Sequence, residues 1–179
     1  MVAIYKELDV FKVPEVFKLD VGCGHKKKDG FFGIDKYDKE GVDFCVDLDE
    51  DGIPFPDNSV DEIYCSHCAE HLNHPEKLLS EIARVMKEDA ILVFRVPYWS
   101  SNEAFFLSHK FQFSEKWLEE AFRCRGFCGI VYSYGWTQEI QDPANPFHIY
   151  WKNIKTRDWC RKHLTNVVWE VQVKCMWKK

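Results

Sequence analysis

The apolar run AILVFRV at residues 90–96 limits the fold of this chain more than any other stretch. Such a run is typical of a central strand that is buried on both faces of a parallel sheet. Apolar residues at helical spacing precede it over 74–87 and follow it over 114–125. A buried strand between two helices indicates β-α-β alternation, and therefore an α/β fold with an open, mostly parallel sheet.

Further strands are predicted on both sides of this core. Residues 166–177 alternate between apolar and polar side chains, which is typical of an antiparallel strand that is half open to solvent. Only the nine residues 22–30 separate the first two predicted strands, so the first crossover helix must be short or absent. A further helix is expected around 157–164. The other predicted strands are at 16–21, 31–35, 42–48, 59–66 and 127–134.

Length and charge restrict the class of protein. The 179 residues show no repeat and no linker, which predicts a single domain over 1–179. A net charge of −5 without an extended basic run disfavours a nucleic-acid partner. No apolar run reaches membrane-spanning length, and the eight scattered cysteines suit reduced thiols in a cytoplasmic protein. Charges within the apolar part of the N-terminus argue against a signal peptide. The oligomeric state is left open.

Residues just after the strands are the candidates for a ligand site, because open parallel sheets bind ligands beyond the carboxyl ends of their strands. The first strand leads into DVGCG (20–24), whose glycines allow a ligand to approach the backbone closely. Asp35 ends the second strand and suits a ribose diol. Lys27 stands where a dinucleotide fingerprint has its third glycine, and Asp35 follows Gly24 by only 11 residues. An NAD-dependent oxidoreductase is therefore disfavoured.

The segment CSHCAEHLNH (65–74) has the composition of a metal site or a redox site. A structural zinc needs about four ligands, and the chain has no second C-x-x-C or H-x-x-x-H outside this segment. A redox C-x-x-C is expected to open a helix after the first strand, which this one does not. We therefore expect neither a metal nor a redox pair at Cys65 and Cys68.

Taken in order, these segments resemble the motifs of the class I S-adenosylmethionine-dependent methyltransferases, most closely the small "type 11" methyltransferase-domain group. The resemblance covers about residues 16–126 and implies a Rossmann-like fold with helices on both faces of the sheet. It leaves 135–165 unmatched, where we expect a lid or an insertion. The matching segments are DVGCG, GID, VDL, PFPDNSVDEIYCSHCAEHL and EIARVMKEDAILVFRVP.

The resemblance implies S-adenosyl-L-methionine as cofactor and a small molecule as methyl acceptor. It assigns the cofactor to eight residues at the strand ends. These are Asp20, Gly22 and Gly24 for the methionine part, Asp35 and Lys36 for the ribose, Asp47 and Leu48 for the adenine, and Ser66 at the end of the fourth strand. The candidates for a general base are His67, His71 and His109, with Tyr98 as an orienting group.

Two departures from the group keep another class of function open. The short first crossover is one. The other is Glu88, Asp89 and Ala90, which replace the usual P-G-G, a swap that the turn tolerates if it needs no positive φ. Both would fit a domain that binds the cofactor without catalysis and acts as a sensor or partner subunit. An RNA methyltransferase is disfavoured by the acidic net charge.

Overall fold

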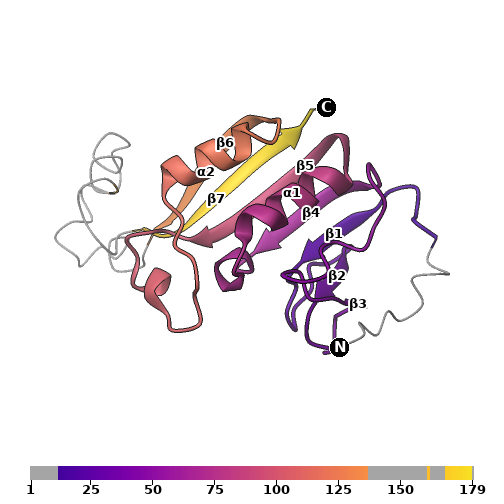
Figure 1. Ribbon diagram of the computed structural model, residues 1–179, viewed down its shortest axis with the longest axis horizontal. Helices are drawn as coiled ribbons and strands as arrows, with labels where there is room; N and C mark the ends of the chain where they lie inside the picture. Colours follow the sequence, from indigo (N-terminus) through magenta and orange to yellow (C-terminus); the bar gives the residue numbers. More distant parts are fainter. Residues whose placement is uncertain (1–11, 137–160, 162–167, 179) are drawn as a thin grey trace.

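Seven strands form one mixed sheet in the order β3-β2-β1-β4-β5-β7-β6 (Figure 1). The computed structural model describes residues 12–136, 161 and 168–178. Strands β1 to β5 are parallel, and β7 lies antiparallel between β5 and β6. The predicted fold class is confirmed. The strands are β1 (Lys18–Val21), β2 (Phe32–Asp35), β3 (Phe44–Cys45), β4 (Val60–Ser66), β5 (Met86–Pro97), β6 (Phe127–Trp136) and β7 (Val168–Trp177).

The strand order reverses between β1 and β4. From β1 the chain moves outward to β2 and β3, and then returns to place β4 on the other side of β1. Such a reversal leaves a crevice beyond the carboxyl ends of the strands, where open α/β sheets bind ligands. The strand order therefore locates a candidate site before any side chain is considered.

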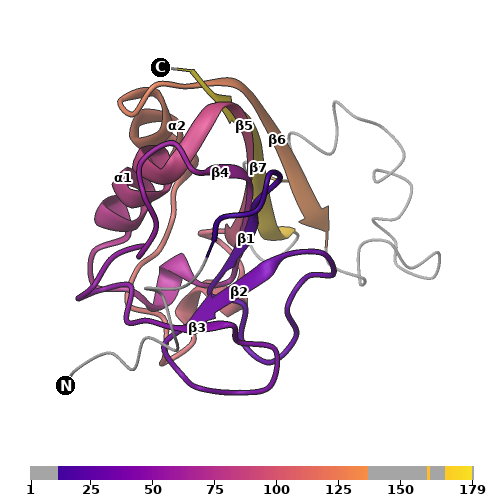
Figure 2. The same ribbon diagram turned by 90° about the vertical axis from the view of Figure 1, so that its right-hand side faces the viewer.

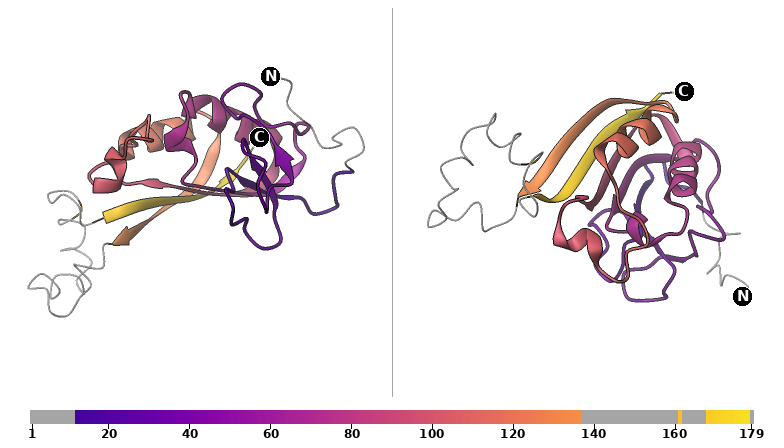
Figure 3. Two further views of the ribbon diagram at one scale, coloured as in Figure 1. Left: turned by 90° about the horizontal axis from the view of Figure 1, so that it is seen from below. Right: turned by 60° about the vertical axis from the view of Figure 1, so that its left-hand side comes forward.

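The two described α-helices, α1 (Pro75–Val85) and α2 (Glu115–Arg123), lie on the same face of the sheet (Figures 2 and 3). Helices were predicted on both faces, and within the described ranges only this face carries them. The side chains of β5 are more deeply buried on the face that carries the helices than on the opposite face. Leu92, Phe94 and Val96 point into the core and are fully buried, whereas the alternate residues Ile91, Val93 and Arg95 are only half-buried. The prediction that this strand is buried on both faces is therefore wrong.

Both helices begin where the sequence indicates. Pro75 occupies the first turn of α1, where its missing N–H removes no helical hydrogen bond. Ser114 caps α2, with its side chain accepting a hydrogen bond from the backbone N–H of Trp117 at 3.1 Å. Helix α1 ends at Val85 and β5 starts at once at Met86, which is earlier than predicted.

The crossover from β1 to β2 contains no helix, as its length predicted. Residues 22–31 form turns instead. Two hydrogen bonds hold this loop against the strands: the Gly22 N–H donates to the Ile34 carbonyl at 2.8 Å, and the Lys28 N–H donates to Oδ2 of Asp20 at 2.7 Å. The loop therefore has a defined position although it contains no helix.

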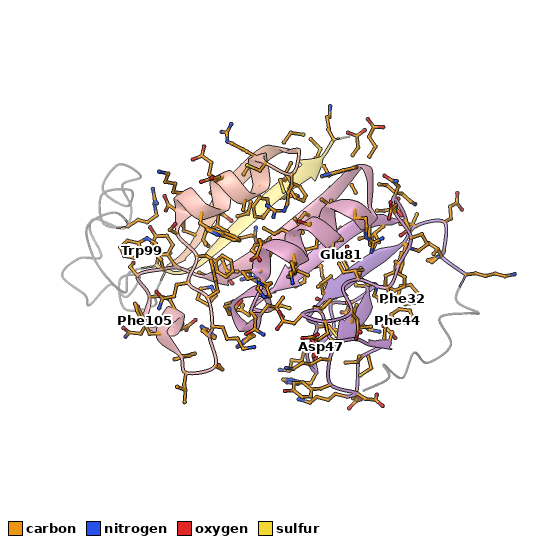
Figure 4. All side chains as sticks on the ribbon, in the orientation of Figure 1. Phe32, Phe44, Asp47, Glu81, Trp99 and Phe105 are labelled. Atoms are coloured by element: carbon orange, nitrogen blue, oxygen red, sulfur yellow. The ribbon has the colours of Figure 1, made fainter. Side chains whose placement is uncertain are left out.

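Aromatic rings fill the core between the sheet and the segments packed on it. At one end, Phe44 meets Phe55 edge-on with ring centroids 5.0 Å apart, and Phe32 lies beside Phe44 (Figure 4). At the other end, Phe94 of β5 contacts Phe122 of α2 at 5.5 Å. Burying these rings supplies much of the apolar area that stabilises a domain of this size.

The predicted helix at 157–164 and the predicted lid at 135–165 fall almost wholly outside the described residues. Arg161 is the exception within the helix, and its guanidinium pairs with the Glu115 carboxylate. Within the described ranges, no helix combines the length and the apolar character needed to cross a membrane.

Candidate functional site

A pocket of about 440 Å³ lies at the carboxyl ends of β1 to β4. Six of the eight predicted cofactor residues line it, together with two of the three predicted catalytic histidines. These are Gly22, Gly24, Asp35, Lys36, Asp47, Leu48, His67 and His71. Sequence reasoning missed the other lining residues, which are Tyr37, Lys39, Val46, Asp49, Cys68, Leu72, Ser108 and Lys110.

Gly22 brings the turn after β1 against the loop after β4. Its φ of 71° lies in the left-handed region that favours glycine. A Cβ at this position would lie 2.4 Å from both Cβ and Sγ of Cys68, a distance that no side chain could tolerate. The glycine is therefore required twice, once for its backbone angle and once for the close approach.

The same contact explains the C-x-x-C segment. Cys68 packs against Gly22, and Cys65 is buried within β4. A hydrogen bond with Cys68 and burial raise the pKa of the Cys65 thiol well above its usual value. Metal binding and disulfide exchange both require the thiolate, which this environment disfavours. The two cysteines therefore act as packing groups.

Asp35 fixes the neighbouring backbone and keeps capacity for a ligand. Oδ2 accepts a hydrogen bond from the Gly24 N–H at 3.0 Å, and Oδ1 accepts one from the Tyr37 N–H at 3.1 Å. An ionised carboxylate has about four acceptor positions, so one remains on each oxygen. The carboxylate is thus oriented toward the pocket and can accept from a pair of hydroxyl groups.

The segment after β3 provides a polar and an apolar wall. Leu48 is buried, and Oδ1 of Asp47 (Figure 4) accepts a hydrogen bond from the Asp49 N–H at 3.0 Å. Asp49 itself accepts from the backbone and side-chain nitrogens of Asn73, at 2.9 and 3.0 Å. Asp49 therefore ties this segment to the loop after β4. It was missed because the acidic run in which it stands is typical of solvated charge.

Asp20 and Ser66, the other predicted cofactor residues, do not line the pocket. Burial raises the pKa of Asp20, and the hydrogen bond from the Lys28 N–H acts in the opposite direction. Asp20 thus holds the loop after β1 in place. Ser66 is half-buried at the end of β4, where it pairs with Arg95 of β5.

His67 follows β4 in a left-handed conformation, with φ of 51°, and both of its ring nitrogens face carboxylates. Nε2 lies 3.0 Å from Oε2 of Glu170, and Nδ1 lies 3.2 Å from Oε1 of Glu70. Burial alone would lower the pKa of His67, but these two contacts outweigh it and raise the pKa to about 9. His67 is therefore protonated at neutral pH.

Glu170 links this histidine to the centre of the sheet. Its Oε1 accepts a hydrogen bond from Nη2 of Arg95 at 2.5 Å, and Nη1 of Arg95 donates to the Tyr64 hydroxyl at 2.9 Å. Burial would raise the pKa of Glu170, yet His67 and Arg95 together lower it. The alternation of apolar and polar residues over 166–177 predicted that the Glu170 side chain faces solvent, whereas its exposed fraction is 3%. That prediction is wrong because two cations cover the residue.

The remaining predicted catalytic residues take different positions. His71 lines the pocket, and its Nδ1 contacts the Ser108 carbonyl at 3.1 Å. His109 is not a lining residue, but its ring lies edge-on to His71 with centroids 4.8 Å apart, and burial lowers its pKa. Tyr98 is buried away from the pocket lining and donates to Oε1 of Glu115. Trp99 and Phe105 lie exposed on the segment that follows β5 (Figure 4).

Comparison with known proteins agrees with this geometry. Residues 32–94 match the family model described as "Methyltransferase domain". A solved SAM-dependent methyltransferase from Archaeoglobus fulgidus superposes with a TM-score of 0.68 at 18% identity, covering 92% of this chain and 87% of that one. The chain therefore has the fold of this SAM-dependent methyltransferase. The predicted resemblance to the type 11 group is confirmed over the matched residues.

Two further methyltransferases are similar to parts or to most of this chain. The uncharacterized methyltransferase YcgJ of Bacillus subtilis is 44% identical over 39 residues, which is 22% of this chain and 15% of that protein. Phosphoethanolamine N-methyltransferase 2 of Haemonchus contortus, solved in complex with S-adenosyl-L-methionine, superposes with a TM-score of 0.57 at 16% identity. The alignment covers 93% of this chain and 50% of that one, so this chain spans about half its length.

Proposed function

We propose that this protein binds S-adenosyl-L-methionine and transfers its methyl group to a small-molecule acceptor. The observation that carries the proposal is the grouping of Gly22, Asp35 and Asp47 around one pocket at the point where the strand order reverses. A volume of about 440 Å³ lies within the usual range for pockets that take a cofactor-sized ligand. The match to a methyltransferase-domain family over residues 32–94 points to the same cofactor.

The pocket residues fit the parts of this cofactor. The free acceptor positions of Asp35 suit the two ribose hydroxyls, and Lys36 lies beside them in the lining. Asp47 and Leu48 offer an acceptor and an apolar surface to the adenine. The backbone turn at Gly22 and Gly24 has no side chain to obstruct the methionine part. Asp20 and Ser66 would act from behind the pocket, by holding β1 and β4.

When bound, the cofactor supplies an electrophilic methyl group on a sulfonium centre. The protein then has to align an acceptor with it and keep water away. His67 and His71 line the pocket, and His109 contacts His71, so this group of histidines is where we place the acceptor. Because carboxylates bind both ring nitrogens of His67, we assign that residue to positioning instead of proton removal.

Two further features support the nature of the acceptor and the location of the protein. The chain has a net charge of −5, which opposes binding to a polyanion and favours a small molecule over RNA. The seven cysteines within the described residues are all free thiols. Free thiols in this number suit a reducing compartment, so we propose a cytoplasmic protein.

Calorimetric titration with S-adenosylhomocysteine tests the cofactor assignment. We expect micromolar binding by the unaltered protein and at least tenfold weaker binding by Asp35→Ala, because the variant loses acceptors for two hydroxyl groups. Asp29→Ala is the matched control, since Asp29 is exposed and lies outside the pocket lining. No binding by the unaltered protein would refute the proposal. Methyl transfer from labelled cofactor in a cell extract then separates an active enzyme from a domain that only binds.

A further inference from the structure

Three side chains at the edge of the pocket are grouped as metal ligands are. Glu70, His71 and His109 each bring one donor atom to within 4.8 Å of the others. Metal–nitrogen and metal–oxygen distances of about 2.1 Å place the donors of one ion within about 4 Å of each other. A modest rotation of these side chains closes the gap, and the exposed ring of His71 has room to move.

Glu70 lacks the hydrogen bonds that a buried carboxylate requires. Its exposed fraction is 0%, and neither carboxylate oxygen completes a hydrogen bond within the part of the chain that is described. Oε1 has an ion-pair contact with Nδ1 of His67 at 3.2 Å, but the other ring nitrogen of His67 contacts Glu170. Glu170 also has Arg95 as a partner, whereas Oε2 of Glu70 has none among the described residues. A buried carboxylate oxygen without a partner is costly, and a bound cation would relieve that cost.

The two imidazoles are prepared in the manner of metal ligands. Nδ1 of His71 contacts the Ser108 carbonyl at 3.1 Å, and a backbone carbonyl in this position fixes the tautomer that leaves Nε2 as a lone-pair donor. Nδ1 of His109 is buried and has no hydrogen-bond partner among the described residues. A buried imidazole nitrogen without a partner is unusual unless a ligand completes it.

Backbone hydrogen bonds hold the two ligand-bearing segments together. Glu70 and His71 belong to the short 3-10 turn Ala69–His71, and His109 comes from the loop after β5. The Glu70 carbonyl accepts from the N–H groups of Lys110 and Phe111, at 2.7 and 3.2 Å. These bonds flank His109 and keep its ring beside His71, so the cluster does not depend on side-chain contacts alone.

We propose that Glu70, His71 and His109 bind one divalent transition-metal ion. Two imidazoles and one carboxylate are a ligand set used for zinc and for non-haem iron, and three protein ligands leave coordination positions for water or for an acceptor oxygen. Because His71 also lines the pocket, the ion lies at the edge of the cofactor site. The site is separate from Cys65 and Cys68. It gives His71 and His109 a role as ligands in place of bases.

Titration of the full chain with Co²⁺ alone, without cofactor, tests the site. We expect one ion to bind per chain, with visible d–d absorption and without the strong near-ultraviolet band of cobalt–thiolate bonds. Glu70→Gln and His109→Ala should each weaken binding at least tenfold by calorimetry. His74→Ala is the matched control, because His74 is exposed nearby and pairs with Glu76. This control should bind Co²⁺ as the unaltered protein does.

Three results would overturn the proposal: no binding of Co²⁺, binding of equal strength in Glu70→Gln and His109→Ala, or a cobalt–thiolate band. Circular dichroism establishes that each variant is folded, and if one is not, the other carries the test. The metal titration needs no S-adenosylhomocysteine, and the S-adenosylhomocysteine titration needs no metal. A failure of the metal site is therefore distinguishable from a failure of the proposed methyltransferase function.

Discussion

Nε2 of His67 lies 3.0 Å from Oε2 of Glu170, a residue 103 positions further along the chain. His67 follows β4 and lines the pocket, whereas Glu170 belongs to β7. The contact therefore makes the pocket dependent on the antiparallel part of the sheet. It also brings a charged group of β7 into contact with a candidate site whose lining comes from residues 22–110.

Glu170→Gln should destabilise the protein, because it removes the negative charge that both Arg95 and His67 contact. We expect the free energy of unfolding to fall by about 2–4 kcal/mol, somewhat less than when a fully buried ion pair loses one partner, because His67 and Arg95 are partly exposed. Urea denaturation measures this loss. Lys174→Gln, at an exposed position of the same strand, is the control and should change stability by less than about 0.5 kcal/mol. Equal losses in the two variants would contradict the assignment.

Gly22→Ala and Gly24→Ala form a matched pair. Both residues have a positive φ, of 71° and 57°, so both variants should lose about 1 kcal/mol from backbone strain. Only at Gly22 would the new Cβ collide with Cys68, whereas at Gly24 no heavy atom of the described residues, its two chain neighbours apart, lies within 4 Å of it. We expect Gly22→Ala to lose a further 1–3 kcal/mol or so. Thermal unfolding of the two variants side by side measures the difference, and the same loss at both sites would argue against the close approach.

Asp89→Gly should stabilise the protein. The replacement of P-G-G by Glu88, Asp89 and Ala90 was expected to be tolerated if no positive φ is needed, but Asp89, within β5, has a φ of 62°, so that condition is not met. Glycine adopts this angle without strain, and we expect a gain of about 0.5–1 kcal/mol in the free energy of unfolding. Glu88→Gly is the control, since Glu88 has no positive φ and the change should only weaken the strand. A gain in the control would show that backbone angle is not the cause.

The Glu81–Arg84 pair should make stability depend on pH. Hydrogen bonds from Arg84 lower the pKa of Glu81 from its usual value of 4.5, and Oε2 of Glu81 also accepts from the Ile53 N–H. A lowered folded-state pKa contributes stability above pH 4.5 or so, which is lost as the pH falls through the folded-state value. Glu81→Gln should therefore cost about 1–2 kcal/mol at pH 7 and progressively less toward pH 3.

Urea denaturation at both pH values measures this convergence. Glu88→Gln serves as the control, because Glu88 is exposed in the turn before the core of β5. Its stability should follow that of the unaltered protein at every pH. A loss in Glu81→Gln that stayed constant between pH 7 and pH 3 would show that the carboxylate charge contributes nothing to holding Ile53 and Arg84 together.

The sequence predicted those parts of the site that depend on local chain geometry. The glycine turn comes directly after β1, Asp35 is the last residue of β2, and Asp47 lies just beyond β3. The strand order brings these three features to one pocket. Glu170 could not be found in this way. Its partners Arg95 and His67 lie far away in the sequence, so alternation along β7 alone indicated a solvated side chain. The positive φ of Asp89 could not be predicted either, because the residue type does not determine the backbone angle.

The side of the sheet on which the helices pack could not be predicted from the sequence either. The apolar run of β5 has the composition of a strand with two covered faces, and Ile91 and Val93 fit that reading as well as Leu92 does. Only the tertiary arrangement shows that α1 and α2 share a face (Figure 3). Likewise, the two cysteines of the C-x-x-C segment gave a metal-like pattern, while the cluster that we propose for a metal uses Glu70 and His71, which follow that segment, and the distant His109.

The position of β7 between β5 and β6 has a consequence for synthesis on the ribosome. Strand β6 emerges before β7, and within the described sheet β7 is its only neighbour. A nascent chain that stops short of Val168 therefore exposes one edge of β5 and leaves β6 without a partner, and unpaired strand edges promote aggregation. Arg95 would at that stage lack the carboxylate of Glu170. Completion of this sheet is thus a late event, and it coincides with the arrival of the residue that secures His67.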